Sequence, residues 1–172
     1  MGVPTASAIE INRDTGTVCV DKYVSLHDAG RILNPALLDG QVCGGFAMAV
    51  GVALYERLVH AEDGGFVTGS LLDYALPTAS MIPEVEILHQ GTPSPVTPLG
   101  AKGVAEGNSM STPVCIANAV ADALGMAEVN LPLTPERVLE MVRRRGNRRS
   151  ASAGRFGIER PNFGHDLEIY SQ

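Results

Sequence analysis

Apolar residues alternate with polar ones, or form short apolar runs, at positions 5–12 and 17–27, on either side of an Asp-Thr-Gly sequence at 14–16. Two such runs around a turn sequence predict a β-hairpin. A second hairpin is predicted around the Glu-Asp-Gly-Gly turn at 62–65, and a further strand at 84–89. The pattern therefore gives two hairpins and one additional strand.

The first helix is predicted from its start signal. Asn34 is followed by Pro35, which is typical of an N-cap with proline at the first helical position, and the helix should continue to about Arg57. Small residues at spacings of four, three and four fall on one stripe of this helix: Gly40, Gly44, Ala47 and Gly51. Interior glycines each cost about 1 kcal/mol of helix stability relative to alanine, so a close approach of a backbone or ligand should compensate.

Two further helices are predicted in the second half of the chain. Residues 112–125 form a helical pattern that Gly125 should end, because glycine is favoured after a helix C-terminus. Pro135 should open a last helix that ends at about Arg145. Five prolines between 83 and 113 exclude regular structure across much of that interval.

Strands and helices follow one another without a steady β-α-β alternation, so the predicted fold class is α+β, a mixed sheet of hairpins packed with three helices. A chain of 172 residues with 45% apolar composition can bury one core. We expect one domain over residues 1–145 and a basic, flexible tail over 146–172.

The charge distribution excludes some partners. Residues 1–142 hold 6 Lys/Arg against 16 Asp/Glu, whereas residues 143–172 hold 7 Arg against 3 acids. An acidic body argues against nucleic acid as a partner, and the basic tail nearly lacks aromatic residues for base stacking. No run of about 18 apolar residues predicts a membrane span, and no secretory signal is visible.

Cysteine usage indicates the compartment. Three cysteines without C-x-x-C spacing fit a reducing environment and argue against a metal site or iron–sulfur cluster in this chain. The cytoplasm is therefore the expected location. Cys43 is interpreted as a small buried residue.

The segment 98–107 is the strongest candidate for chemistry. Gly100, Gly103 and Gly107 allow positive φ and close approach of a ligand to the backbone. Glu106 is the acid of this loop, and a carboxylate between apolar segments could serve as a general base. For an arbitrary loop, a solvated glutamate without a chemical role is the commoner outcome.

Two other candidates have competing interpretations. Gln41 lies beside the small-residue stripe, and its amide could bind a cofactor or could be a surface amide on a tightly packed helix. His27 and Asp28 could be a ligand pair, but a histidine at the end of a strand is more often a hydrogen-bonded structural residue.

Four segments together resemble the end of the large subunit of the molybdenum hydroxylases, the family of xanthine dehydrogenase, aldehyde oxidase and aerobic carbon monoxide dehydrogenase. They occur in the family's order and cover roughly residues 5–142. The segments are HDAGRILNPALLDGQVCGG (27–45), GSLLDYALP (69–77), TPSPVTPLGAKGVAEG (92–107) and ANAVADALG (117–125).

The resemblance implies one half of a molybdenum-cofactor-binding domain. Glu106 would be the general base in a hydroxylation that takes its oxygen from water. The residues implied to contact the molybdenum–molybdopterin cofactor are Gln41, Lys102, Gly103, Val104 and Ala105. Ala105 stands where many relatives have glycine, and Ala29 stands where the family usually has cysteine.

The resemblance also implies partners. The remainder of the molybdopterin-binding subunit would complete the cofactor site, and iron–sulfur clusters and FAD would lie on partner subunits. A homo-oligomer is also possible. The alternative is a non-catalytic fragment or small oligomeric domain that binds no cofactor. The chain alone is expected to be inactive.

Overall fold

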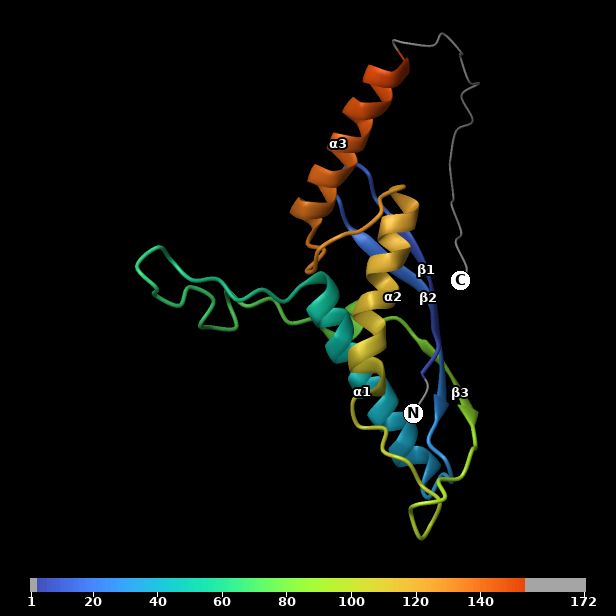
Figure 1. Cartoon of the computed structure of the whole chain (residues 1–172). Coiled ribbons are helices and arrows are strands. Elements are labelled where there is room, and N and C mark those ends of the chain that lie inside the picture. The colour runs from blue at the N-terminus through green and yellow to red at the C-terminus, as the bar shows by residue number, and fades with distance from the viewer. Residues whose placement is uncertain (1–2, 154–172) are drawn as a thin grey trace.

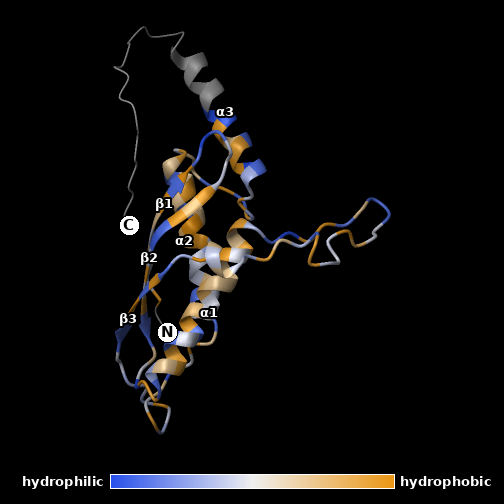
Figure 2. Cartoon of the chain, turned by 180° about the vertical axis from the view of Figure 1, so that it is seen from behind, coloured by the Kyte–Doolittle hydropathy of each residue, from blue (hydrophilic) through white to orange (hydrophobic). Residues whose placement is uncertain are grey.

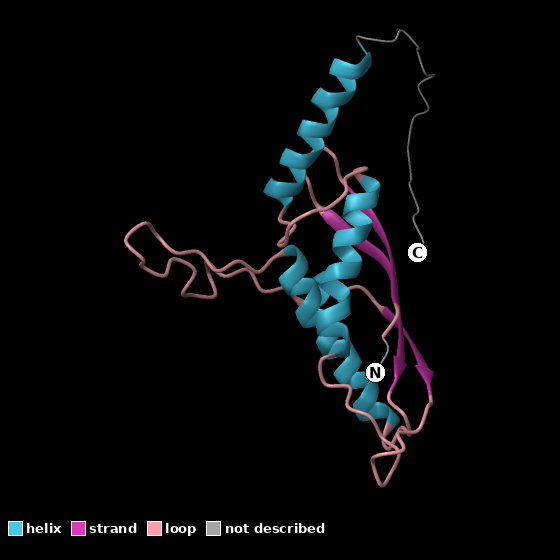
Figure 3. Cartoon of the chain, in the orientation of Figure 1, coloured by secondary structure: helices cyan, strands magenta, loops and turns pink. Residues whose placement is uncertain are grey.

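A computed structural model describes residues 3–153 of the chain. The elements follow one another in the order β1 (Thr5–Ile11), β2 (Val18–Asp28), α1 (Pro35–Leu54), η1 (Ala79–Met81), β3 (Val85–Gln90), α2 (Gly107–Ala123) and α3 (Pro135–Ala153). The fold is α+β, as the sequence predicts, with three α-helices and a mixed sheet (Figure 3).

The sheet has three strands in the order β1-β2-β3. β1 and β2 form the predicted antiparallel hairpin, whereas β3 pairs with β2 in parallel, with His27 opposite His89. The predicted second hairpin forms only as a short turn without named strands, in which the Ala61 amide donates to the Gly65 carbonyl and the Val67 amide to the Val59 carbonyl. Only one isolated bridge, between His60 and Phe66, forms around that turn, because the segment lies away from the sheet and has no third strand to extend the pairing.

α1 and α2 lie together beside the sheet, with α2 in contact with both α1 and β1, whereas α3 extends away from these two helices (Figure 1). The centre of the core is a pair of fully buried rings, Tyr23 of β2 and Phe46 of α1, whose centroids are 4.4 Å apart. The Tyr23 hydroxyl forms a buried hydrogen bond of 2.7 Å with Thr112 of α2. One aromatic pair and one hydrogen bond thus connect the sheet to both helices.

The start of α1 agrees with the prediction, but its end does not. Asn34 accepts a hydrogen bond from the Leu37 amide at 3.2 Å and Pro35 begins the helix. The helix ends at Leu54 instead of Arg57, because the Tyr55 and Glu56 amides both donate to the Gly51 carbonyl and close the last turn.

By length and composition alone α1 could span a membrane, with a mean hydropathy of 1.6. The helix is nearly free of strongly hydrophilic positions, as the colouring of Figure 2 makes visible. Its buried residues nevertheless pack against the sheet and α2, with Phe46 and Ala53 fully buried. In this fold α1 is a core helix.

The helix predicted at 112–125 begins earlier, at Gly107, and contains Pro113. Proline in a helix interior removes one backbone hydrogen bond and costs about 3 kcal/mol. Here Pro113 is buried against the core, so tertiary packing offsets a cost that local sequence rules treat as decisive. Gly125, with φ of 57°, ends the helix region as predicted, and its amide donates to the Asp122 carbonyl.

The last helix begins at Pro135 as predicted but continues to Ala153 instead of ending at about Arg145. Arginine and alanine are good helix formers, and one glycine costs too little to stop such a run. The expected boundary between a domain and a basic tail therefore falls inside α3. Residues 154–172 of that expected tail lie outside the described part of the chain.

The segment between α1 and η1 forms a long loop that extends away from the helices (Figure 1). A hydrogen bond of 2.5 Å from the Tyr74 hydroxyl to the Glu56 carboxylate ties it near its base. Several of its large apolar side chains are solvent-exposed, among them Leu71 at 81% and Leu72 at 93%. The exposed side chains of this loop form an apolar surface against which no other part of the described chain packs.

Candidate functional site

The segment 98–107 is anchored to the residues that follow β2. The Arg31 amide donates to the Gly100 carbonyl at 3.0 Å, and the Lys102 amide donates to the Ala29 carbonyl at 2.9 Å. Gly30 has φ of 63°, and a Cβ there would collide with the Gly100 carbonyl. Glycine at position 30 therefore permits the close approach that positions the loop.

Asp28 and Lys102 form an ion pair of 2.6 Å, and both side chains are partly buried. The Asp28 carboxylate also accepts from the amides of Gly30 and Thr92. The Lys102 ammonium, followed by these two amides, holds the pKa of Asp28 well below its usual range. The Lys102 side chain thus secures the loop to the end of β2.

Because the pKa of Asp28 is depressed by folding, its carboxylate stabilises the fold above the ordinary aspartate pKa of 3.8, and this contribution is lost as the pH falls below that value. We expect Asp28→Asn to flatten the pH dependence of the free energy of unfolding between pH 4 and 2, measured by urea denaturation.

Glu86→Gln is the matched control, because it removes an exposed ion pair with Lys22. Such pairs contribute at most about 1 kcal/mol, and this variant should retain the wild-type acid dependence. An Asp28→Asn variant with that same acid dependence would refute the assigned role of the Asp28–Lys102 pair.

The structure brings Gln41 into contact with the predicted loop. The Gln41 Nε2 atom donates to the Ala105 carbonyl at 2.9 Å, so its amide oxygen remains available to accept from a ligand. Val104 packs on the small apolar cluster of Ala29, Leu38 and Val42. The loop is therefore held between the end of β2 and the first half of α1.

The backbone amides of residues 103–106 donate to no partner in the described part of the chain. Gly103 is exposed, and a Cβ built on it would meet nothing within 4 Å. Gly100 has the predicted positive φ, whereas Gly103 and Gly107 do not. Four free donors on an open, anchored loop are suited to receive an anionic group.

Glu106 lies at the N-cap of α2 with an exposed side chain. Its carboxylate makes no capping hydrogen bond. Glu106 is thus presented beside the free amides of its own loop.

The small-residue stripe of α1 is only partly covered. Gly51 is buried against Glu56 and Pro77, whereas Cβ atoms built on Gly40 or Gly44 would meet nothing within 4 Å. Cys43 is exposed, which corrects its interpretation as a buried residue. The exposed end of the stripe is the end that carries Gln41.

Sequence reasoning missed a buried polar cluster beneath the loop. Ser25, His27 and Asn108 are buried and hydrogen-bonded to one another, with Ser25 Oγ 2.8 Å from Asn108 Oδ1. Burial, more than any other factor, lowers the pKa of His27. His27 therefore has the structural, hydrogen-bonded role that the sequence favours, and it does not form a ligand pair with Asp28. No sequence signal identified Asn108, because the sequence predicted that this helix begins at 112 and not at Gly107.

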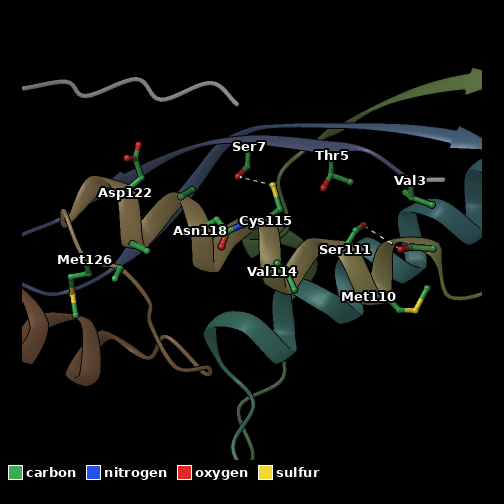
Figure 4. A pocket seen from close by; sticks show the side chains of 14 residues that line it. Val3, Thr5, Ser7, Met110, Ser111, Val114, Cys115, Asn118, Asp122 and Met126 are labelled. Carbon is green, nitrogen blue, oxygen red and sulfur yellow. Dashed lines mark hydrogen bonds between the residues drawn. The ribbon is translucent and has the colours of Figure 1, made fainter.

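A groove of about 820 Å³ runs between β1 and α2 (Figure 4). Thr5 and Ser7 line it from β1, and Met110, Cys115 and Asn118 from α2. The Cys115 thiol donates to Ser7 Oγ across it at 3.3 Å. The predicted cofactor-binding residues do not line this groove, so the candidate site is the open surface formed by the loop and α1.

Residues 2–83 match the family described as "Molybdopterin cofactor-binding domain". The chain is 41% identical to the nicotine 6-hydroxylase large subunit of Paenarthrobacter nicotinovorans over 137 residues, covering 78% of this chain and 17% of that protein. It is 36% identical to the carbon monoxide dehydrogenase large chain of Hydrogenophaga pseudoflava, covering 76% of this chain and 17% of the relative.

Solved structures agree with these sequence relatives. A crystal structure of Cu,Mo-CO dehydrogenase in the carbon monoxide reduced state matches with a TM-score of 0.80 and 33% identity, covering 84% of this chain and 18% of that one. Quinoline 2-oxidoreductase from Pseudomonas putida 86 matches with a TM-score of 0.76 and 34% identity, covering 81% of this chain and 18% of the other.

The chain spans less than a fifth of the length of the relatives it matches. The four sequence segments, the α+β fold and both sets of relatives point to the same group of enzymes. The chain belongs to the molybdenum hydroxylases of the xanthine dehydrogenase, aldehyde oxidase and carbon monoxide dehydrogenase family and is part of a molybdopterin-binding large subunit.

Proposed function

We propose that this chain forms one wall of the molybdenum cofactor site of a molybdenum hydroxylase and supplies its general base. The observation that carries the proposal is the contact between Gln41 and Ala105, which places the amide of Gln41 beside the free backbone amides of 103–106 and the exposed Glu106. These are the residues that the family resemblance assigns to the cofactor.

The donor set fits an anionic pterin cofactor. The free amides of Gly103, Val104 and Ala105 would bind its negatively charged groups, and Gln41 would orient it through the amide oxygen that Ala105 leaves free. The missing Cβ atoms of Gly40 and Gly44 leave room for close approach to α1. Lys102 would act through its ion pair with Asp28, which holds the loop in place.

When bound, the cofactor supplies two-electron oxidation of a substrate carbon with oxygen from water. Glu106 accepts a proton on its carboxylate in that reaction, and general-base assistance of this kind contributes about 10²–10⁴ in rate. The anchored loop holds the backbone of Glu106 in place, so less orientation entropy remains to be lost at the moment of proton transfer. The names of the relatives cover several substrates, and the described residues select none of them.

The remainder of the large subunit would complete the site, with iron–sulfur and flavin subunits accepting the electrons. The exposed end of the small-residue stripe of α1 and the exposed apolar side chains of the long loop are surfaces that such partners would cover. A second copy of the chain would cover the same surfaces in the absence of that partner. All three cysteines are free, which fits the reducing cytoplasm.

The competing function is a domain that binds no cofactor, and the presence of donors on one side only favours it for the chain in isolation. Metal analysis distinguishes the two. We expect well below one molybdenum per chain for the chain purified alone, because the donors come from one side only, and near one per chain in a complex with the rest of the subunit.

The measurement is molybdenum per chain by elemental analysis of protein isolated from its native source, before and after separation of the complex by size. A native complex without molybdenum would contradict the proposed function. A monomer with one molybdenum per chain would contradict a site in which this chain supplies donors from one side only.

A further inference from the structure

The side-chain amide of Asn108 is buried where β2, α1 and the start of α2 meet, and only 2% of the residue is exposed. Its Nδ2 donates to the backbone carbonyl of Val42 on α1 at 3.1 Å. Its Oδ1 accepts from Ser25 Oγ at 2.8 Å and lies 3.2 Å from His27 Nε2. One side chain therefore joins three elements of the fold.

The chemistry of its neighbours fixes the orientation of this amide. The Val42 carbonyl can only accept, so Nδ2 must face it and Oδ1 must face Ser25 and His27. Because Oδ1 can only accept, its 3.2 Å contact with His27 Nε2 is a hydrogen bond when Nε2 carries a proton, and burial lowers the pKa of His27 and thereby favours the neutral ring. The amide of Asn108 thus has one orientation in this cluster, and His27 Nδ1 is a buried nitrogen without a partner among the described residues.

The network lies directly under the candidate site. Asn108 follows Glu106 by two residues, and Val42 follows Gln41. The start of α2 and the preceding loop are tied to this stretch of α1 twice, through the exposed bond from Gln41 to Ala105 and through the buried bond from Asn108 to Val42. Water competes for the exposed bond, whereas breaking the buried one leaves the Nδ2 donor of Asn108 without a partner in a buried site, so the buried tie is the stronger restraint.

We propose that Asn108 is a positioning residue that holds the Glu106 loop in register with Gln41, an inference that rests on the proposed function for its catalytic consequence. Two hydrogen bonds to adjacent residues of α1 leave the loop little freedom to slide along the helix. General-base catalysis depends on such a fixed geometry, since small misplacements of a catalytic group cost large factors in rate.

The test uses backbone order parameters from nitrogen-15 relaxation of the full 172-residue chain. We expect the amides of 103–106 to have values near those of a rigid backbone, about 0.85, in the wild type and to fall below about 0.6 in Asn108→Ala. Ser25→Ala, which removes one donor to Asn108 and leaves α2 unchanged, should move the same amides in the same direction by a smaller amount.

Thr112→Val is the matched control. Thr112 lies one helical turn after Asn108 and also makes a buried hydrogen bond from α2 to β2, to Tyr23, whereas Asn108 also donates to α1. This variant should lower the free energy of unfolding without lowering the order parameters of the amides of residues 103–106. If Asn108→Ala and Ser25→Ala leave the loop amides as ordered as in the wild type, or if Thr112→Val loosens them equally, the positioning role is refuted.

The relaxation measurement requires no cofactor, so its outcome is independent of the proposed reaction. If the loop loosens in Asn108→Ala while Glu106→Gln retains full turnover in the assembled enzyme, the positioning role stands and the proposed function fails. If the loop stays ordered while Glu106→Gln abolishes turnover, the proposed function stands and the positioning role fails.

Discussion

Replacing Glu106 by glutamine should lower turnover per molybdenum at least about a hundredfold in the assembled enzyme, with molybdenum content unchanged. Glutamine is nearly isosteric with glutamate and still forms hydrogen bonds, but it cannot accept a proton at neutral pH. The expected loss corresponds to removal of a general base. The measurement is turnover divided by bound molybdenum for the wild type and the variant.

The location of Glu106 makes this substitution a clean test. Its side chain is exposed and makes no capping hydrogen bond at the start of α2, so the variant removes no internal contact of the chain. The loop remains anchored through Lys102 and through the hydrogen bond from Gln41 to Ala105. A change in turnover can therefore be assigned to the carboxylate and not to loss of fold.

Gln41→Ala is the comparison variant. It removes the amide that holds Ala105 and, in the proposed site, orients the cofactor. We expect it to lower molybdenum content or to shift the reactivity of the bound cofactor, because the lost group is a hydrogen-bonding positioner and not a base. Normal turnover and full cofactor in Glu106→Gln would leave Glu106 as a solvated loop residue.

Replacing Phe46 by alanine should cost about 3–5 kcal/mol in the free energy of unfolding. The Phe46 side chain is fully buried and its ring lies 4.4 Å from that of Tyr23, so truncation leaves a cavity between α1 and the sheet. Because small domains are stable by about 5–15 kcal/mol, this single change removes a large share of the total. Urea denaturation of the full chain measures the difference.

Met48→Ala is the control for Phe46→Ala on the same helix. Met48 is a large apolar residue of α1, but 55% of it is exposed, so its truncation should change the free energy of unfolding by at most about 0.5 kcal/mol. Equal losses in the two variants would mean that α1 does not pack on the sheet through Phe46.

The sequence alone predicted the features that depend on neighbouring residues. Asn34 caps its own helix through the Leu37 amide, and Gly125 ends α2 because glycine adopts positive φ readily. The hairpin of β1 and β2 also follows from local alternation around one turn. The α+β class and the family resemblance rest on such short patterns and were confirmed. Within the candidate site, local sequence drew attention to Gln41 and to the loop ending at Glu106.

Only the tertiary structure decided the features that depend on residues far apart in the chain. Burial of Pro113 lets α2 start at Gly107, and parallel pairing joins β3 to β2. The ion pair of Asp28 with Lys102 spans 74 positions, and the hydrogen bond from Asn108 to Val42 spans 66. Such contacts leave no periodic signal in the sequence, because the two partners come within interaction distance only once distant segments have folded together. The same physical reason explains why the anchoring of the Glu106 loop became visible only in the folded chain.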